Sequence, residues 1–125
     1  MISQITDDIY IGDKEDAERA EGLKRICVHE NPIVLVSTDI HIPFVYCERA
    51  SIEMLDLIYQ TIESLLAQGD KVLVYCHMGI ERSPLAVVWY LHKKYAMSIE
   101  EAYQIVLPRR KQAMDRRQWL PPIYQ

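Results

Sequence analysis

Residues 71–95 constrain the fold more than any other part of the 125-residue chain. They open with the strand-like run from Lys71 to Tyr75, apolar after its first residue, and close with Pro84 to Tyr95, a helical stretch that is apolar nearly all round. Such a run is typical of a strand buried in a parallel sheet. A helix without a polar face belongs in the core. The segment therefore predicts a strand–loop–helix unit at the centre of an α/β domain.

Further elements are expected on both sides of this unit. Apolar residues at steps of three or four predict an amphipathic helix from Ser51 to Ala67, with Ser51 as its N-cap. Shorter patterns predict strands over 9–12, 33–37 and 41–45, an exposed helix over 13–23, and a helix opened by a capping box at Ser98. Strands alternate with helices, which favours an α/β sandwich. Without a linker or repeat, residues 1–125 are expected to form one domain.

The composition limits the expected cellular location of the chain and the kinds of site that its cysteines and histidines can form. No run of apolar residues is long enough to span a membrane, and the first ten residues lack the features of a signal peptide, so a cytoplasmic location is expected. Cys27, Cys47 and Cys76 are odd in number and widely spaced, which argues against a disulfide framework. No cysteines or histidines have zinc-ligand spacing. The sequence therefore predicts neither a metal nor a cofactor.

Charge divides unevenly along the chain. Residues 1–70 carry 5 Lys/Arg and 14 Asp/Glu, a net −9, whereas residues 71–125 carry 9 and 4, a net +5. The positive half holds the candidate anion site described next, which suits a phosphorylated ligand. On charge alone, a solvated basic surface is the preferred interpretation. The acidic first half argues against nucleic acid as a partner but does not exclude it.

The loop between the central strand and helix is the candidate site. A strand–loop–helix unit aims backbone N–H groups at an anion, and this loop is of a length to wrap one phosphate. Ser83 is expected as the helix N-cap, and Pro84 as the first helical residue. The expected phosphate-binding residues are Cys76, His77, Met78, Gly79, Ile80, Glu81 and Arg82.

The residue types in this loop predict nucleophilic chemistry. A helix N-terminus and a guanidinium both favour the thiolate form of Cys76. Arg82 offers a planar fork that matches two phosphate oxygens. The thiolate would attack a phosphomonoester and form a cysteinyl-phosphate, which water hydrolyses. The Ser83 hydroxyl would assist departure of the sulfur. The alternative is a buried, inert Cys76 with Arg82 in a surface ion pair.

Residues 76–84 resemble the signature loop of the dual-specificity protein tyrosine phosphatases, a branch of the Cys-x5-Arg superfamily. Residues 5–12 resemble that family's opening strand, and residues 51–67 resemble its helix before the catalytic strand. Residues 89–91 and 98–103 resemble the helices that follow the signature loop. The resemblance implies a mixed central sheet flanked by helices. It also implies phosphorylated protein substrates, with hydrolysis of phosphotyrosine and of phosphoserine or phosphothreonine.

Two positions depart from the family pattern. Tyr75 stands where a histidine usually precedes the nucleophile, and Tyr46 falls where the aspartic general acid is usual. Glu48 is preferred as the general acid over Asp39 because it fits the loop position better. Cys47 lies in the same loop and is either a redox partner of Cys76 or an ordinary thiol.

Two other functions use the same loop. One is an RNA 5′-triphosphatase, which tolerates loss of the usual acid and is compatible with the basic C-terminal half. The other is a phosphoprotein-binding module with a phosphate cradle but little catalysis. Arg109, Arg110 and Lys111 are expected to be a solvated helix end.

Overall fold

A computed structural model of the chain describes residues 1–30, 40–44 and 49–125. Its centre is a five-stranded sheet of order β1-β2-β5-β3-β4. The strands are β1 (Ser3–Gln4), β2 (Ile9–Gly12), β3 (Leu23–Cys27), β4 (Ile40–His41) and β5 (Lys71–Tyr75). β1 pairs antiparallel to β2, whereas the pairs β2–β5, β5–β3 and β3–β4 are parallel. The expected mixed α/β architecture is confirmed.

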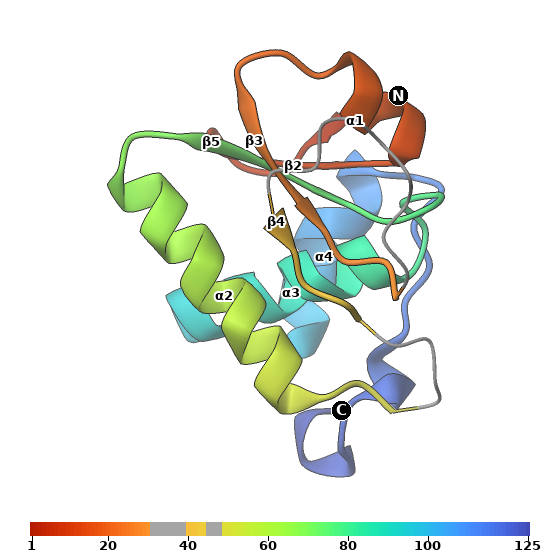
Figure 1. Ribbon diagram of the computed structural model, residues 1–125. Helices are drawn as coiled ribbons and strands as arrows, with labels where there is room; N and C mark the ends of the chain where they lie inside the picture. Colours follow the sequence, from red (N-terminus) through yellow and green to blue (C-terminus); the bar gives the residue numbers. More distant parts are fainter. Residues whose placement is uncertain (31–39, 45–48) are drawn as a thin grey trace.

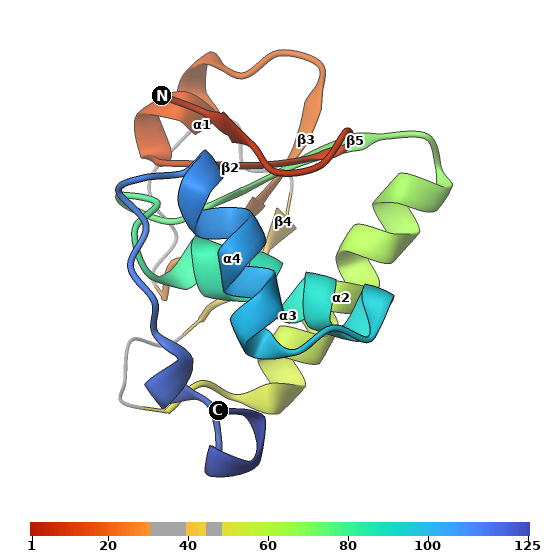
Figure 2. The same ribbon diagram turned by 180° about the vertical axis from the view of Figure 1, so that it is seen from behind.

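Helices cover the sheet on both faces (Figure 1). The helices are α1 (Lys14–Arg19), α2 (Ile52–Ala67), α3 (Arg82–Tyr95) and α4 (Ile99–Arg109), followed by the 3₁₀ turns η1 (Arg117–Trp119) and η2 (Pro122–Tyr124). α1 lies on one face of the sheet, while α2 and α3 pack on the other. α4 packs on α3, as Figure 2 shows from behind. α3 is therefore enclosed between the sheet and α4.

The central strand β5 explains this layering. Its side chains alternate between the two faces of the sheet, as in any strand. Val72 and Val74 enter the large core shared with α2, α3 and α4. Leu73 and Tyr75 enter a smaller core beneath α1. All four side chains are fully buried, so β5 reads as a continuous apolar run.

Capping positions the helices as expected. The Ser51 side chain accepts a hydrogen bond from the Met54 amide and opens α2. Ser98 and Glu101 form a reciprocal capping box that opens α4. Both helix starts predicted from the sequence are confirmed.

Several predicted boundaries were wrong. The helix expected over 13–23 is shorter: Asp13 is its N-cap, α1 ends at Arg19, and Leu23 begins β3. The strand expected over 41–45 appears as Ile40–His41 in the described part of the chain. The strand expected over 33–37 lies outside the described residues.

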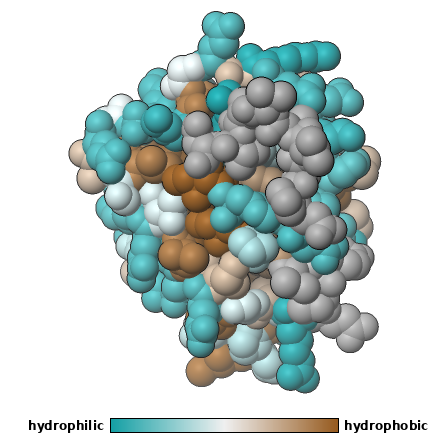
Figure 3. Space-filling model, viewed as in Figure 1, coloured by the Kyte–Doolittle hydropathy of each residue, from teal (hydrophilic) through white to brown (hydrophobic). Residues whose placement is uncertain are grey.

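The face seen in Figure 3 is mostly hydrophilic, with apolar side chains in a central patch and a further apolar group at the lower end. In the part of the chain that the structure describes, no helix has the length and apolar character needed to cross a membrane.

Candidate active site

Cys76 follows β5 directly, at the carboxyl end of the parallel strands, where α/β sheets bind their ligands. Its side chain is buried, at 3% exposure. The sulfur accepts a hydrogen bond from the Gly79 amide at 3.2 Å and lies 3.3 Å from the Ser83 hydroxyl. The nucleophile candidate thus has polar partners on two sides.

The backbone of the loop is held by its carbonyl groups. The carbonyls of residues 77–80 each accept a hydrogen bond from a group outside the loop. The donors are, in order, Lys14 N (3.2 Å), Arg110 Nη2 (3.5 Å), Arg110 Nε (2.7 Å) and Met114 N (2.8 Å). Since C=O and N–H point in opposite directions across a trans peptide, the amides of residues 78–81 face the interior of the loop.

The enclosed space is suited to an anion. Successive inward amides form a concave nest that binds phosphate-like groups. A pocket of about 220 Å³ lies within the loop. It is lined by Cys76, His77, Met78, Ile80, Glu81 and Arg82. The expected phosphate-binding residues other than the buried Gly79 line this pocket with their own atoms.

Glycine is required at position 79 by the backbone conformation there and by the atoms packed against it. Its φ of +66° is one that other residues rarely adopt. A Cβ at this position would lie 2.4 Å from Arg110 Nη2 and 2.6 Å from the Gly12 carbonyl oxygen. The glycine therefore lets the loop pack directly against a guanidinium and against the end of β2.

Arg82 and Ser83 stand in the first turn of α3. The N-cap of this helix is Glu81, so the prediction of Ser83 as the N-cap was wrong. Ser83 lies one residue inside the helix, fully buried, with its hydroxyl facing the sulfur. Arg82 Nη2 contacts the Glu30 carboxylate at 3.5 Å. Helix α3 thus presents a guanidinium and a hydroxyl to the same loop.

The charge of the loop is partly neutralised from outside. Glu81 accepts a hydrogen bond from Arg116 Nε at 2.7 Å, in a half-buried ion pair. The imidazole ring of His77, which lines the pocket, lies 5.9 Å from that of His29. Within 1–30, 40–44 and 49–125, no three His, Cys, Asp or Glu residues are grouped to hold a metal ion.

The structure therefore brings Cys76, Arg82 and Ser83 together, as the sequence predicts. Glu48, the alternative acid Asp39 and the thiol Cys47 all lie outside the described residues. Tyr75 packs into the small core beneath α1 with Leu73 and not into the loop interior.

Arg110 is the site residue that sequence reasoning missed. The prediction that it is part of a solvated helix end was wrong: it is 1% exposed and bonds the loop backbone. Its neighbours Arg109 and Lys111 are exposed, as expected. No local pattern distinguishes these three basic residues, because the partners of Arg110 lie far away in the sequence.

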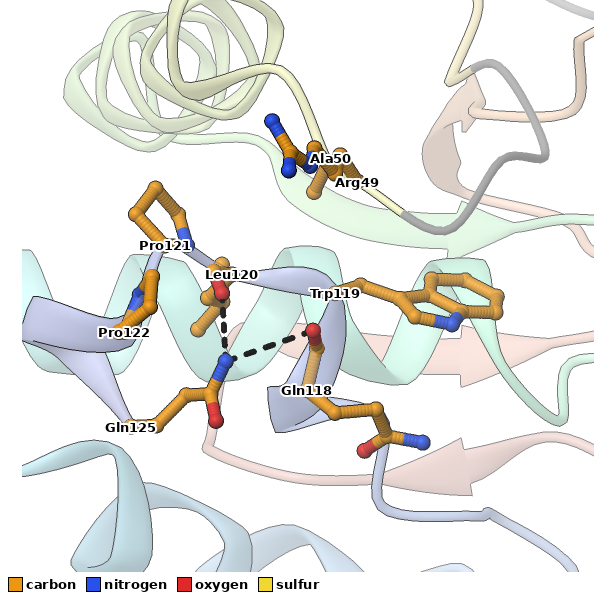
Figure 4. A pocket seen from close by; sticks show the side chains of 8 residues that line it. All are labelled: Arg49, Ala50, Gln118, Trp119, Leu120, Pro121, Pro122 and Gln125. Atoms are coloured by element: carbon orange, nitrogen blue, oxygen red, sulfur yellow. Dashed lines mark hydrogen bonds between the residues drawn. The ribbon is translucent and has the colours of Figure 1, made fainter.

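A second, larger pocket of about 640 Å³ lies near the C-terminus (Figure 4). Its lining is Arg49, Ala50, Gln118, Trp119, Leu120, Pro121, Pro122 and Gln125. The Gln125 amide donates to the carbonyls of Gln118 and Leu120 across it. The pocket shares no residue with the loop of Cys76 and offers no nucleophile among these side chains.

Comparisons with known proteins agree with this geometry. Residues 23–125 match the family model described as the dual specificity phosphatase catalytic domain. The chain is 32% identical over 122 residues to Dual specificity protein phosphatase 1B of Arabidopsis thaliana, covering 90% of this chain and 73% of that protein. It is 30% identical over 119 residues to human Protein phosphatase Slingshot homolog 2, covering 86% of this chain but 8% of that protein.

Solved structures share the fold. The crystal structure of a human DUSP28 variant superimposes with a TM-score of 0.81 at 18% sequence identity. The match covers 94% of this chain and 88% of that one.

Proposed function

The chain belongs to the dual specificity phosphatase family and is a protein phosphatase; we propose that it hydrolyses phosphotyrosine and phosphoserine or phosphothreonine through a phosphoryl group carried on Cys76. We further propose that residues 1–125 form one catalytic domain. The mechanism needs Cys76 as a free thiol, as it is in the described structure, which suits a reducing, cytoplasmic location.

The observation that carries this proposal is the orientation of the loop peptides. Four consecutive carbonyls are bonded outside the loop, so the four opposite amides face the pocket that Cys76 also lines. Preorganised amides stabilise the negative charge on equatorial phosphate oxygens without reorganising during the reaction. The same amides and the nearby guanidinium favour the thiolate.

The proposed reaction consists of two displacements at phosphorus. The Cys76 thiolate attacks phosphorus, the bond from phosphorus to the ester oxygen breaks, and the leaving oxygen takes a proton from a general acid, for which we propose Glu48. Water then attacks the cysteinyl-phosphate and releases inorganic phosphate. The Ser83 hydroxyl, 3.3 Å from the sulfur, stabilises the departing thiolate in this second step.

Arg82 binds the phosphate in both steps. Its guanidinium contacts Glu30 at 3.5 Å, and a dianionic phosphate would compete with this carboxylate for the guanidinium. A bidentate arginine–phosphate pair holds two equatorial oxygens in a fixed plane. We propose that this exchange of partners accompanies substrate binding.

Hydrolysis of para-nitrophenyl phosphate across pH tests the proposal with wild type, Cys76→Ser and Glu48→Gln. We expect Cys76→Ser to abolish turnover and to retain binding of inorganic phosphate, because the amide nest and Arg82 remain. Turnover by Cys76→Ser would contradict the nucleophile assignment. Phosphopeptide binding by wild type without a burst of leaving group at any pH would instead favour a binding module.

The general acid is tested by changing the leaving group. Loss of general acid catalysis slows a reaction by about 10²–10⁴-fold. We expect Glu48→Gln to be slow with an alkyl phosphate, whose leaving group needs the proton, and less affected with an aryl phosphate. Wild-type rates on both substrates would show that Glu48 is not the acid.

A further inference from the structure

A buried arginine lies behind the phosphate loop. Arg110 follows the last turn of α4 and is 1% exposed. Beyond its bonds to the loop, its Nη1 donates to the Met1 carbonyl at 2.9 Å, to Ser3 Oγ at 3.0 Å and to the Ile11 carbonyl at 3.4 Å. Removing a guanidinium from water costs several kcal/mol in general, and neutral carbonyls return only part of that cost. Stability alone gives little reason to keep a charge in this position.

Arg110 contacts two consecutive peptides of the loop, one of which carries the amide that bonds the sulfur. Nε donates to the Gly79 carbonyl at 2.7 Å, and Nη2 donates to the Met78 carbonyl at 3.5 Å. The amide that shares a peptide with the Met78 carbonyl is that of Gly79, which donates to Cys76 Sγ at 3.2 Å. Holding these carbonyls outside the loop therefore holds the amides of residues 79 and 80 inside it.

We propose that Arg110 is a positioning residue of this active site, which keeps the loop amides turned toward Cys76 and adds a positive charge that favours the thiolate. This inference rests on the proposed function. Arg82 acts from the substrate side of the loop, whereas Arg110 acts from behind it and does not touch the phosphate. The site then has two arginines with different tasks.

The charges around Arg110 come from several elements. Burial lowers the pKa of Arg110, and the charges of Asp16, Asp13 and Cys76 oppose that shift, in this order. Asp16 also contacts the amino group of Met1 at 3.2 Å. Other charged or titratable groups around the loop include His77 and Glu81 within it and Arg82 at the start of α3. From the packed elements they include Lys14 and Glu15 of α1, His29 and Glu30 after β3, and Arg116 after α4.

The test compares Arg110→Met, Arg110→Lys and the matched control Arg109→Met, whose exposed side chain bonds within α4. The readout is alkylation of Cys76 by iodoacetamide as a function of pH, followed by mass spectrometry of the Cys76 peptide. Methionine retains the bulk of the side chain but neither the charge nor the donors. Lysine retains the charge and loses the planar fork.

We expect Arg110→Met to move the midpoint of the alkylation profile upward by about one pH unit, which is about tenfold less alkylation near pH 6. Arg110→Lys should show a smaller shift in the same direction and weaker binding of inorganic phosphate. Arg109→Met should match wild type. A folded Arg110→Met with the wild-type profile would overturn the inference, even if its melting temperature fell.

If Arg110→Met does not fold, the Arg110→Lys variant provides the test of the inference. A wild-type profile together with wild-type phosphate affinity in that variant would overturn the inference, and a shift in either supports it. Failure of the proposed function looks different: wild type itself would then show no preferential alkylation of Cys76 near neutral pH.

Discussion

Ser83 illustrates how one hydroxyl can be placed by a helix that it does not cap. Because α3 begins at Arg82, the side chain of the next residue points back across the loop toward the sulfur. Ser83 is fully buried, and Cys76 Sγ is its hydrogen-bonding partner among the described side chains. Its contribution should therefore appear in the step that releases the thiolate.

Replacement of Ser83 by alanine should slow the second displacement and spare the first. A hydrogen bond to a charged group is worth about 1.5–3 kcal/mol, so kcat should fall by about tenfold or more. A burst of para-nitrophenol in stopped-flow measurements should remain or grow, because the intermediate accumulates. An unchanged kcat without accumulation would contradict this role.

Glu30 should weaken substrate binding by occupying Arg82. The pair is 3.5 Å apart with a half-exposed carboxylate, so its strength is under about 1 kcal/mol. We expect Glu30→Gln to lower KM and the Kd for inorganic phosphate by about two- to fivefold. Glu18→Gln, an exposed carboxylate on α1, serves as the control. Weaker phosphate binding by Glu30→Gln would contradict the competition.

The residues that could be found from the sequence are those whose geometry is local. Cys76, Arg82 and Ser83 lie on one strand–loop–helix unit, so their convergence follows from the element pattern alone. Arg110 was missed because its partners are 31 residues away at Gly79 and 107 away at Ser3. Periodicity cannot distinguish it from the exposed Arg109 beside it.

Helix α2 should stabilise the fold through one face only. Ile58 is fully buried against the large core, whereas Leu57 beside it is 46% exposed. Ile58→Ala should lower the free energy of unfolding by about 2–5 kcal/mol, because it removes buried methyl groups and leaves a cavity. Leu57→Ala should change it by about 0.5 kcal/mol or less, as measured by urea denaturation. Equal losses would contradict the assigned helix face.

A carboxylate joins α2 to α3 and makes that contact dependent on pH. Hydrogen bonds from Tyr90 (2.5 Å) and Lys94 (2.9 Å) lower the pKa of Glu63 below its ordinary 4.5. The unfolded chain then binds the proton more readily than the folded one does. Stability from this group is therefore present above 4.5 and is lost as pH falls through the lowered folded value.

The comparison of wild type with Glu63→Gln isolates this contribution. The difference in melting temperature between the two proteins should be largest above pH 4.5 and should shrink in more acidic solution. A difference that grows with acidity would have the wrong sign and would contradict the assignment.

Strand β3 shows why some elements cannot be predicted from the hydrophobic pattern of the sequence. Its sequence from Leu23 to Cys27 places two basic residues in a strand that pairs on both sides. Arg25 is accommodated because it donates to the Ala17 and Ala20 carbonyls of α1, and Lys24 is exposed. The short helix α1 covers only the face that carries Arg25, and Lys24 lies on the opposite face, so the strand lacks the apolar run that identified β5.

The whole fold meets at the phosphate loop. Donors from α1 and from the segment after α4 hold its carbonyls, while β5 and α3 supply its two ends. The acidic and basic halves of the sequence therefore contribute to one site. Its preorganisation depends on the packing of the domain and not on the loop sequence alone.

Trapping the covalent intermediate tests the central claim most directly. Wild type mixed with a phosphomonoester and quenched in acid should carry one phosphoryl group, located on Cys76 by peptide mass spectrometry. Cys76→Ser should carry none, and Ser83→Ala should carry more than wild type at steady state. Turnover by wild type with no phosphoryl group on Cys76, or with one on another residue, would contradict the account.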